Sequence, residues 1–382
     1  MVLNHGISQD KIKNTFKDLE IHTLICNRDL MLAINNFKSI QKFEEFSEVP
    51  VILHDDGSLT DSDIEILQTI KNVIIIRRAH ADELIREYVQ DHPNCLEYRL
   101  GDNKINLWHK IKSFDYWFFS KTKNVLGMDT DLLFLRKPEN VIELIKSNTP
   151  FYYPDIQSAY CFNEPKSEIP VIEKVNTGLI YIPSEEYYNI NDIENALSNL
   201  LKNGINYFPS WIEQSAYAHM FYKNGKYVSL SDQKYKIPYF QKVDIEVTEC
   251  LHFVSYPAVR ETYQTYLEYL EFETGDLVYE AEFTTKYKEI TIPSNFKIHK
   301  SNGVYNMTYY WGLEETSQQF LDHIFKIHTE EGVIEKKLQS DKNGFFIFTT
   351  KSNVVKIEHT YDWYGENEWV DLGDIPLFLS IY

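Results

Sequence analysis

The sequence predicts an α/β fold: a Rossmann-like mixed sheet with flanking helices, followed by a β-rich, sandwich-like C-terminal domain. In about the first 150 residues, short apolar runs alternate with segments whose apolar residues recur at helical spacing. Strands joined by helical crossovers form largely parallel sheets. From Gly275 onward, runs of period-two alternation are separated by turn signals, which is typical of antiparallel strands. We therefore expect two domains, residues 1–274 and 275–382.

The apolar runs and the helical spacing predict the individual elements of the N-terminal domain. We expect strands over residues 21–27, 49–53 and 73–76, and helices over residues 30–43, 61–70 and 81–90. Residues 73–76 are all β-branched, which suits a strand that is buried on both faces. Further along, the pattern predicts amphipathic helices over residues 106–117, 136–147, 192–201 and 211–217, a strand over residues 175–182 and a surface loop over residues 151–170.

Composition and charge exclude several classes of function. The formal net charge is −19, which argues against nucleic acid as a partner because phosphate binding depends on Lys and Arg. No apolar run approaches the ~18 residues of a transmembrane helix, and Met1 to Asn14 lacks a signal-peptide core. The four cysteines form no C-x-x-C pair, so a zinc knuckle or redox dithiol is not indicated. We expect a soluble, cytoplasmic protein.

The segment Asn124 to Pro138 carries the strongest chemical signal. It reads Asn-Val-Leu-Gly-Met-Asp-Thr-Asp-Leu-Leu-Phe-Leu-Arg-Lys-Pro, so that Asp129 and Asp131 stand between two apolar runs. Burying unpaired charge costs several kcal/mol, roughly, unless something compensates it. A divalent cation compensates two nearby carboxylates, and oxygen ligands suit Mg²⁺ or Mn²⁺. The alternative interpretation is a polar corner between a strand and a loop.

Two other classes of α/β protein fit less well. A dehydrogenase would carry G-x-G-x-x-G after the first strand, and a sugar nucleotidyltransferase would carry a Gly-rich, basic loop there. Instead, Ile25 is followed by Cys-Asn-Arg-Asp-Leu, which contains no glycine.

The order of four motifs resembles a known family. Asp129-Thr130-Asp131 is followed by Asn176-Thr177-Gly178, then by Glu213-Gln214 and finally by His252. This order resembles the GT-A glycosyltransferases that use nucleotide-sugar donors, and within them the retaining family of glycogenin and the bacterial lipopolysaccharide galactosyltransferases. Two departures are visible: the family commonly has Asp-Gln where this chain has Glu-Gln, and the Gly and Lys-Pro that often follow the histidine are missing here.

The resemblance implies a role for each matching residue. Asp129, Asp131 and His252 would hold Mn²⁺ (or Mg²⁺), and Glu213 and Gln214 would act at the reacting sugar. The implied donor contacts are Thr23, Asn27, Lys110, Asp129, Thr130, Asn176 and Gly178. Two of these have equally ordinary interpretations, since Asn27 could cap the following helix and Lys110 could lie on a solvated helix face shared with Lys112.

The implied activity is metal-dependent transfer of a hexose from a nucleoside diphosphate sugar, with UDP-sugars favoured, to a saccharide or protein hydroxyl, with retention. The alternative is a non-catalytic sugar-binding or scaffold protein that keeps the fold. Aromatic clusters at residues 309–311 and 361–364 fit an accessory carbohydrate-binding or oligomerisation module, or ordinary core packing.

Overall fold

The computed structural model describes residues 16, 18–101, 108–122, 124–161, 170–183, 187–202, 211–238, 240–254 and 260–272, and the C-terminal strands between residues 276 and 374. The chain divides into two compact units. The first comprises Met1–Ile237 and Val247–Val254, and the second Pro238–Glu246 and Ser255–Tyr382.

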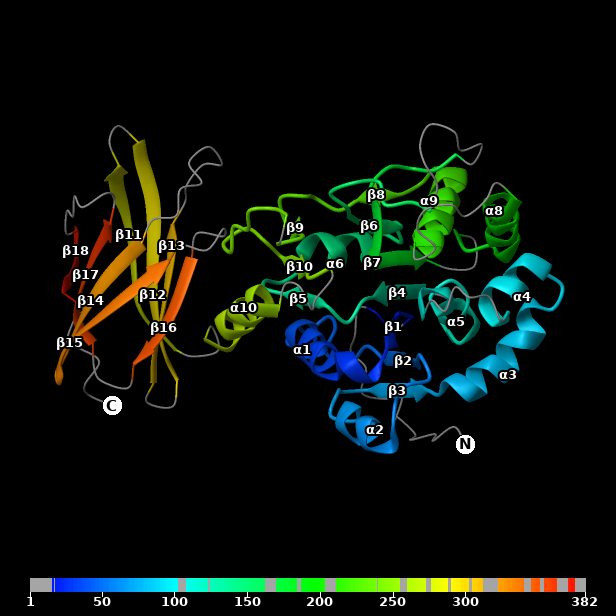
Figure 1. Cartoon of the computed structure of the whole chain (residues 1–382), viewed down its shortest axis with the longest axis horizontal. Helices are drawn as coiled ribbons and strands as arrows, with labels where there is room; N and C mark the ends of the chain where they lie inside the picture. The colour runs from blue at the N-terminus through cyan, green and yellow to red at the C-terminus, as the bar shows by residue number, and fades with distance from the viewer. Residues whose placement is uncertain are drawn as a thin grey trace. The chain divides into compact units, whose positions relative to one another are not determined.

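The first unit is built on a seven-stranded sheet with the order β3-β2-β1-β4-β7-β6-β8 (Figure 1). Only β7 runs against its neighbours, β4 and β6, while the other pairs are parallel. The predicted mixed, largely parallel sheet is therefore confirmed. Its strands are β1 (Glu20–Ile25), β2 (Val51–Asp55), β3 (Val73–Ile76), β4 (Asn124–Met128), β6 (Phe151–Pro154), β7 (Val175–Pro183) and β8 (Val228–Ser229).

Helices flank this sheet, as the sequence pattern predicts. α1 begins after a short 3-10 turn, and α2 begins at a capping box in which Thr60 and Asp63 exchange hydrogen bonds. The helices of the first unit are η2 (Asn27–Asp29), α1 (Leu30–Gln41), α2 (Asp61–Leu67), α3 (Arg78–Val89), α4 (Pro93–Leu100), η3 (Trp108–Ile111), α5 (Asp115–Phe118), α6 (Glu139–Lys146), α8 (Ile190–Lys202) and α9 (Ile212–Asn224).

Two expected elements differ from the structure. The single amphipathic helix over residues 106–117 is replaced in its described part by the short helices η3 and α5, because residues 110–117 are buried on all sides and not on one face. The expected loop over residues 151–170 begins with the buried strand β6, since Phe151, Tyr152 and Tyr153 are good strand formers. Residues 102–107 and 162–169 lie outside the described part of the chain.

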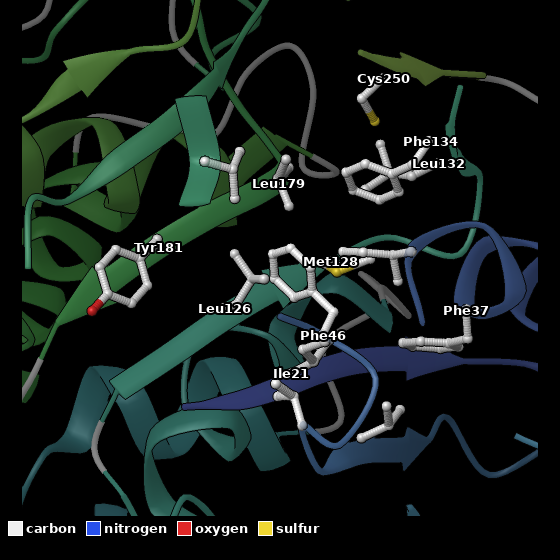
Figure 2. Close-up of a cluster of buried hydrophobic side chains, with 14 of the residues drawn as sticks. Ile21, Phe37, Phe46, Leu126, Met128, Leu132, Phe134, Leu179, Tyr181 and Cys250 are labelled. Carbon is white, nitrogen blue, oxygen red and sulfur yellow. The ribbon is translucent and has the colours of Figure 1, made fainter. Parts of the chain in front are cut away.

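A small second sheet brings a distant segment to the end of β4. β5 (Leu132–Phe134) pairs antiparallel with β10 (Cys250–His252), and β10 pairs parallel with β9 (Tyr235–Lys236). Figure 2 shows the core around this junction, where Met128 of β4, Leu132 and Phe134 of β5, Leu179 of β7 and Cys250 of β10 gather. Each of these five side chains is fully buried, so the turn between β4 and β5 rests on a packed apolar base.

The second unit is β-rich, as predicted. It contains α10 (Arg260–Phe272) and two four-stranded antiparallel sheets, ordered β11-β12-β13-β16 and β15-β14-β17-β18. Their strands are β11 (Asp276–Tyr287), β12 (Ile290–Ser301), β13 (Val304–Trp311), β14 (Asp322–Thr329), β15 (Gly332–Gln339), β16 (Phe345–Thr350), β17 (Val354–Asp362) and β18 (Val370–Asp374). Of the two aromatic clusters, residues 309–311 fall in β13 and residues 361–362 end β17, while residues 363–364 and the side chains of both clusters lie outside the described part of the structure.

Within the described residues, no helix combines the length and the apolar character that crossing a membrane requires.

Candidate metal centre

The turn between β4 and β5 carries Asp129, Thr130 and Asp131, and three other elements fix its backbone. The Asp129 amide donates to the Gly178 carbonyl of β7 at 2.8 Å, and the Asn36 side chain of α1 donates to the Asp129 carbonyl at 2.7 Å. The Phe253 amide, directly after β10, donates to the Asp131 carbonyl at 2.9 Å. The two carboxylates are therefore presented by a backbone held from three sides.

His252 reaches the same turn through strand register. It pairs with Leu132 in the antiparallel β5–β10 ladder, which places its ring beside Asp131. Its Nε2 lies 3.1 Å from Asp131 Oδ1 and 3.8 Å from Asp129 Oδ2. One ligand atom from each of these residues lies within 4.8 Å of the other two. The three residues predicted as metal ligands thus form one cluster.

Gly178 makes room for the His252 ring. A Cβ atom at residue 178 would lie 2.2 Å from His252 Cε1, far inside van der Waals contact. On the other side, the Tyr153 ring meets the His252 ring edge to face at 5.4 Å. The Asn-Thr-Gly motif therefore has a steric function here, because any larger residue at position 178 would push the imidazole away from the two carboxylates.

The cluster fits a divalent cation. Ligand atoms that lie about 2.1 Å from one ion are at most about 4.2 Å apart, so a shift of well under 1 Å would bring these atoms to bonding distance. Asp131 Oδ1 is buried without a well-aligned hydrogen bond from the described part of the protein, and its charged neighbour is His252 Nε2 at 3.1 Å. Two carboxylates with one imidazole suit Mn²⁺ better than Mg²⁺.

Lys112 is the cation nearest to the cluster. Its Nζ donates to Asp129 Oδ1 at 2.6 Å and lies 4.0 Å from Glu213 Oε1. The residue is only 3% exposed. Burial alone would lower the pKa of Lys112, but the Asp129 and Glu213 carboxylates outweigh it and raise this pKa to about 12. Lys112 is therefore charged throughout the physiological range.

The charges of the cluster also shift the pKa values of its own side chains. Burial disfavours an ionised Asp129, yet Lys112 and His252 together hold the pKa of its carboxyl below the usual value. Burial likewise disfavours a charged His252, and Asp131 and Asp129 raise its pKa above the usual value. In the metal-free protein, Lys112 and His252 supply the positive charge that stabilises the two aspartates.

Glu213 is the third carboxylate of this region. It lies on α9, is 2% exposed, and accepts a hydrogen bond from the Thr177 hydroxyl of β7 at 3.0 Å. Its Oε1 has no hydrogen-bond donor within the described residues. Burial raises the pKa of Glu213 to about 7, with Lys112 opposing and Asp129 adding to the shift. Near neutral pH this side chain can therefore hold or release a proton.

A cavity of about 430 Å³ opens beside the cluster. It extends from the β4–β5 turn to the carboxyl ends of β1 and β2, where parallel strands of an open sheet commonly bind ligands. The lining combines two cationic side chains, Arg28 and Lys112, with acidic and polar groups and with His109, whose pKa is lowered to about 4 by burial and by Lys112. It is formed by Leu24, Cys26, Asn27, Arg28, Asp29, Asp56, Ser58, His109, Lys112, Asp129, Thr130 and Asp131.

The other predicted site residues take different positions. Asn27 and Thr130 line the cavity, whereas Thr23 and Lys110 are buried and are not among its lining residues. Asn176 accepts from the Gly178 amide at 2.8 Å and donates to Asp155 at 3.2 Å, so it shapes the start of β7. Gln214 donates through its side-chain amide to the Ala159 carbonyl at 2.9 Å.

Sequence reasoning did not select Lys112 or His109 as site residues. Both follow the segment 102–107, and the spacing from the lysines to Asp129 does not settle which lysine faces the cluster. No local sequence signal separates Lys112 from Lys110, because both lysines lie in the same buried stretch.

Comparison with known proteins finds similarity among solved structures. No protein-family model and no curated protein matches the chain. Mouse xyloside xylosyltransferase 1, in its apo form, is similar at 10% identity and a TM-score of 0.41, over 62% of this chain and 98% of that chain. An active-site mutant of LgtC is similar at 11% identity and a TM-score of 0.41, over 62% and 87% of the two chains.

A third similar structure is the Mn/GDP form of core-mannan synthase A from Aspergillus fumigatus, at 12% identity and a TM-score of 0.35, over 56% of this chain and 72% of that chain. These solved structures are glycosyltransferases, the class of protein that the sequence motifs indicate. Because identities and TM-scores are this low, the function proposed below rests on the side chains of the site.

The first prediction concerns Gly178. Gly178→Ala should displace the His252 ring and weaken Mn²⁺ binding about 10- to 100-fold, the usual range for disturbing a group that orients a metal ligand. Isothermal titration with Mn²⁺ measures this change. Gly127→Ala is the matched control, since its added Cβ would meet the Ile180 side chain at 2.9 Å in the same sheet. Equal Mn²⁺ affinity in the Gly178 variant and the wild type would contradict this account of the glycine.

The second prediction concerns the pH dependence of stability through Glu213. The pKa of Glu213 is about 7 in the folded protein against a usual 4.5. The stabilisation from its protonated form is therefore complete below about pH 4.5 and is lost as pH rises through about 7. Relative to wild type, Glu213→Gln should gain stability between pH 5 and pH 8, by at most about 3 kcal/mol at 1.36 kcal/mol per pH unit.

Urea unfolding at several pH values measures this difference. Glu194→Gln provides a control, because the pKa of the Glu194 carboxyl is shifted in the opposite direction, downward, by hydrogen bonds that outweigh burial. A constant stability difference between wild type and Glu213→Gln across this pH range would contradict the assignment.

Proposed function

We propose that the protein is a metal-dependent glycosyltransferase that moves a hexose from a nucleoside diphosphate sugar to a hydroxyl acceptor, with retention at the anomeric carbon. The observation that carries this proposal is the cluster of Asp129, Asp131 and His252, with Lys112 beside it, at one end of a cavity of about 430 Å³. Such a volume is suited to a ligand of small-molecule size.

Asp129, Asp131 and His252 are the residues that would hold the metal, with Mn²⁺ favoured over Mg²⁺ by the imidazole. A bound divalent cation supplies positive charge that offsets the charge developing on a leaving diphosphate. The chain's contribution is to fix the three ligands in place through β4, β5, β7 and β10. Fixed charges of this kind stabilise a transition state without reorganisation.

Lys112 lies where the diphosphate would bind. Its charge is permanent and its ammonium is held between Asp129 and Glu213. We propose that a phosphate oxygen replaces either Asp129 or Glu213 as a partner of the Lys112 ammonium. Lys112 would then neutralise negative charge on the leaving diphosphate. Arg28, which also lines the cavity, extends the basic surface, whereas His109 is a neutral imidazole near pH 7 because burial and Lys112 lower its pKa to about 4.

The far end of the cavity suits the nucleoside. The carboxyl ends of β1 and β2 carry Asn27, Asp56 and Ser58. The backbone N–H of Asn27 donates to Ser58 Oγ at 2.9 Å. Amide, carboxylate and hydroxyl groups can bond to base edges and ribose hydroxyls. A UDP-sugar is the donor that we favour, on the resemblance of the motifs to the retaining family.

Glu213 and Gln214 would act at the sugar. Glu213, with one buried oxygen that has no described donor, is proposed to accept a hydrogen bond from a sugar hydroxyl. The amide nitrogen of Gln214 is already bonded to Ala159, so the proposed stabilisation of positive charge on the sugar falls to its side-chain oxygen. A retaining reaction of this type needs no separate general base, because the leaving diphosphate can accept the acceptor's proton.

The competing hypothesis is a non-catalytic sugar-binding or scaffold protein. It predicts nucleotide-sugar binding without release of nucleotide. The intact set of two aspartates, one histidine and one buried lysine favours catalysis, because buried charges that serve no chemistry destabilise the fold.

The third prediction tests the metal requirement. With UDP- or GDP-sugars and Mn²⁺, the protein should release nucleotide slowly even without an acceptor, and EDTA should abolish the release. Asp129→Asn and Asp131→Asn should each reduce the rate at least ~100-fold, because each removes a charged ligand. Released nucleotide is measured by chromatography, with Asp61→Asn as a control because its side chain is 99% exposed and is not among the cavity-lining residues. Full activity in EDTA, or in either variant, would exclude this role.

The fourth prediction is stereochemical. From an α-linked donor, the first product should be α-linked, because the proton of the attacking hydroxyl is taken by the leaving diphosphate on the same face. Proton NMR of the product before mutarotation decides the question. A β-linked product would show inversion, and Glu213 would then be the candidate general base.

A further inference from the structure

Helix α9 contacts Lys112 through Glu213 and also through Tyr217, and the proposed chemistry does not use the Tyr217 contact. The Tyr217 hydroxyl donates to the Lys112 backbone carbonyl at 2.9 Å. The same hydroxyl accepts from Trp117 Nε1 at 3.2 Å. Tyr217 is fully buried. Its hydroxyl therefore joins both ends of the segment that runs from η3 into α5.

Glu213 and Tyr217 lie four residues apart on α9, so they lie on the same face of the helix, one turn apart. Glu213 lies 4.0 Å from the ammonium of Lys112, and Tyr217 binds the carbonyl of the same residue. One helix therefore contacts Lys112 at its backbone and at its charged end. This arrangement fixes where a long, four-carbon side chain places its charge.

We propose that Tyr217 is a positioning residue that sets the distance between the Lys112 ammonium and the metal-binding carboxylates. The inference rests on the function proposed above and extends it to a residue outside the cavity lining. Without the Tyr217 hydroxyl, the Lys112 carbonyl and the Trp117 N–H both lose their described partner in a dry interior. The segment then shifts so that the Lys112 carbonyl and the Trp117 N–H regain hydrogen-bond partners, and the Lys112 ammonium moves away from Asp129.

This shift has two opposite consequences. Lys112 places a positive charge 2.6 Å from an oxygen of Asp129, one of the proposed ligand carboxylates, so it opposes cation binding. Moving the ammonium away should therefore tighten Mn²⁺ binding. The same movement withdraws charge from the diphosphate and should slow the release of nucleotide. General loosening of the fold would instead weaken both properties.

Tyr188 supplies the matched control. Its hydroxyl donates to the Ser113 carbonyl at 2.7 Å, one residue further along the same segment, and it is also buried. Tyr188→Phe thus removes a tyrosine hydroxyl from a backbone carbonyl without acting on Lys112 itself. Both tyrosine variants keep the aromatic ring and its packing.

The experiment compares Tyr217→Phe, Tyr188→Phe, Lys112→Met and the double variant Tyr217→Phe/Lys112→Met in the full-length protein. Mn²⁺ dissociation constants are measured by titration, and nucleotide release from a UDP-sugar, or from a GDP-sugar if no UDP is released, is measured with saturating Mn²⁺. We expect Tyr217→Phe to bind Mn²⁺ about threefold or more tightly and to lower kcat about 10- to 100-fold. Tyr188→Phe should stay within about twofold of wild type in both measurements.

The double variant separates positioning from general structure. If Tyr217 acts through Lys112, Tyr217→Phe should change neither quantity by more than about twofold once Lys112 is Met, because coupled residues are not additive. Additive losses, or weaker Mn²⁺ binding in Tyr217→Phe, overturn the proposal. A wild type that binds Mn²⁺ but hydrolyses no donor refutes the proposed function alone, and the Mn²⁺ constants still decide the role of Tyr217.

Discussion

Three carboxylates share one corner of the first unit, with Glu213 buried and Asp129 and Asp131 partly exposed, and their mutual repulsion governs the rest of the site. Asp129, Asp131 and Glu213 lie around Lys112 and His252, and both basic groups have pKa values raised by them. Charge collected in this way is stable only when it is paired or binds an ion. The lysine and the histidine pair it here, and the proposed divalent cation would do so when bound.

Hydrogen bonds and strand register hold these charged side chains in a rigid arrangement. Asp129 and Asp131 are held through hydrogen bonds from three elements, and His252 is held through the β5–β10 register. The segment that carries Lys112 is fixed in turn by the buried pair of Arg99 and Asp115, whose side chains meet at 2.8 Å through two bonds. Bidentate pairs of this kind fix geometry as well as charge, so α4 contributes to the site without touching it.

The sequence alone predicted the parts of this frame that depend on local pattern. Alternating periods predicted the parallel strands and flanking helices, and Asp129, Asp131 and His252 were predicted as ligands from motif order. Lys112 was missed because the choice between two lysines depends on how the surrounding segment turns, and that turn is set by Tyr217 and Arg99 from distant elements. Strand β6 was missed because its burial comes from neighbouring β7 and β8.

The central claim is that the Asp129, Asp131 and His252 cluster is a metal site. Crystals of the protein soaked in Mn²⁺ test it most directly, through anomalous diffraction near the manganese edge. The account predicts one strong anomalous peak within about 2.0–2.3 Å of the three ligand atoms, with Lys112 displaced from Asp129. A peak elsewhere, or a cluster that keeps its Lys112–Asp129 pair at high Mn²⁺ with no peak, would contradict it.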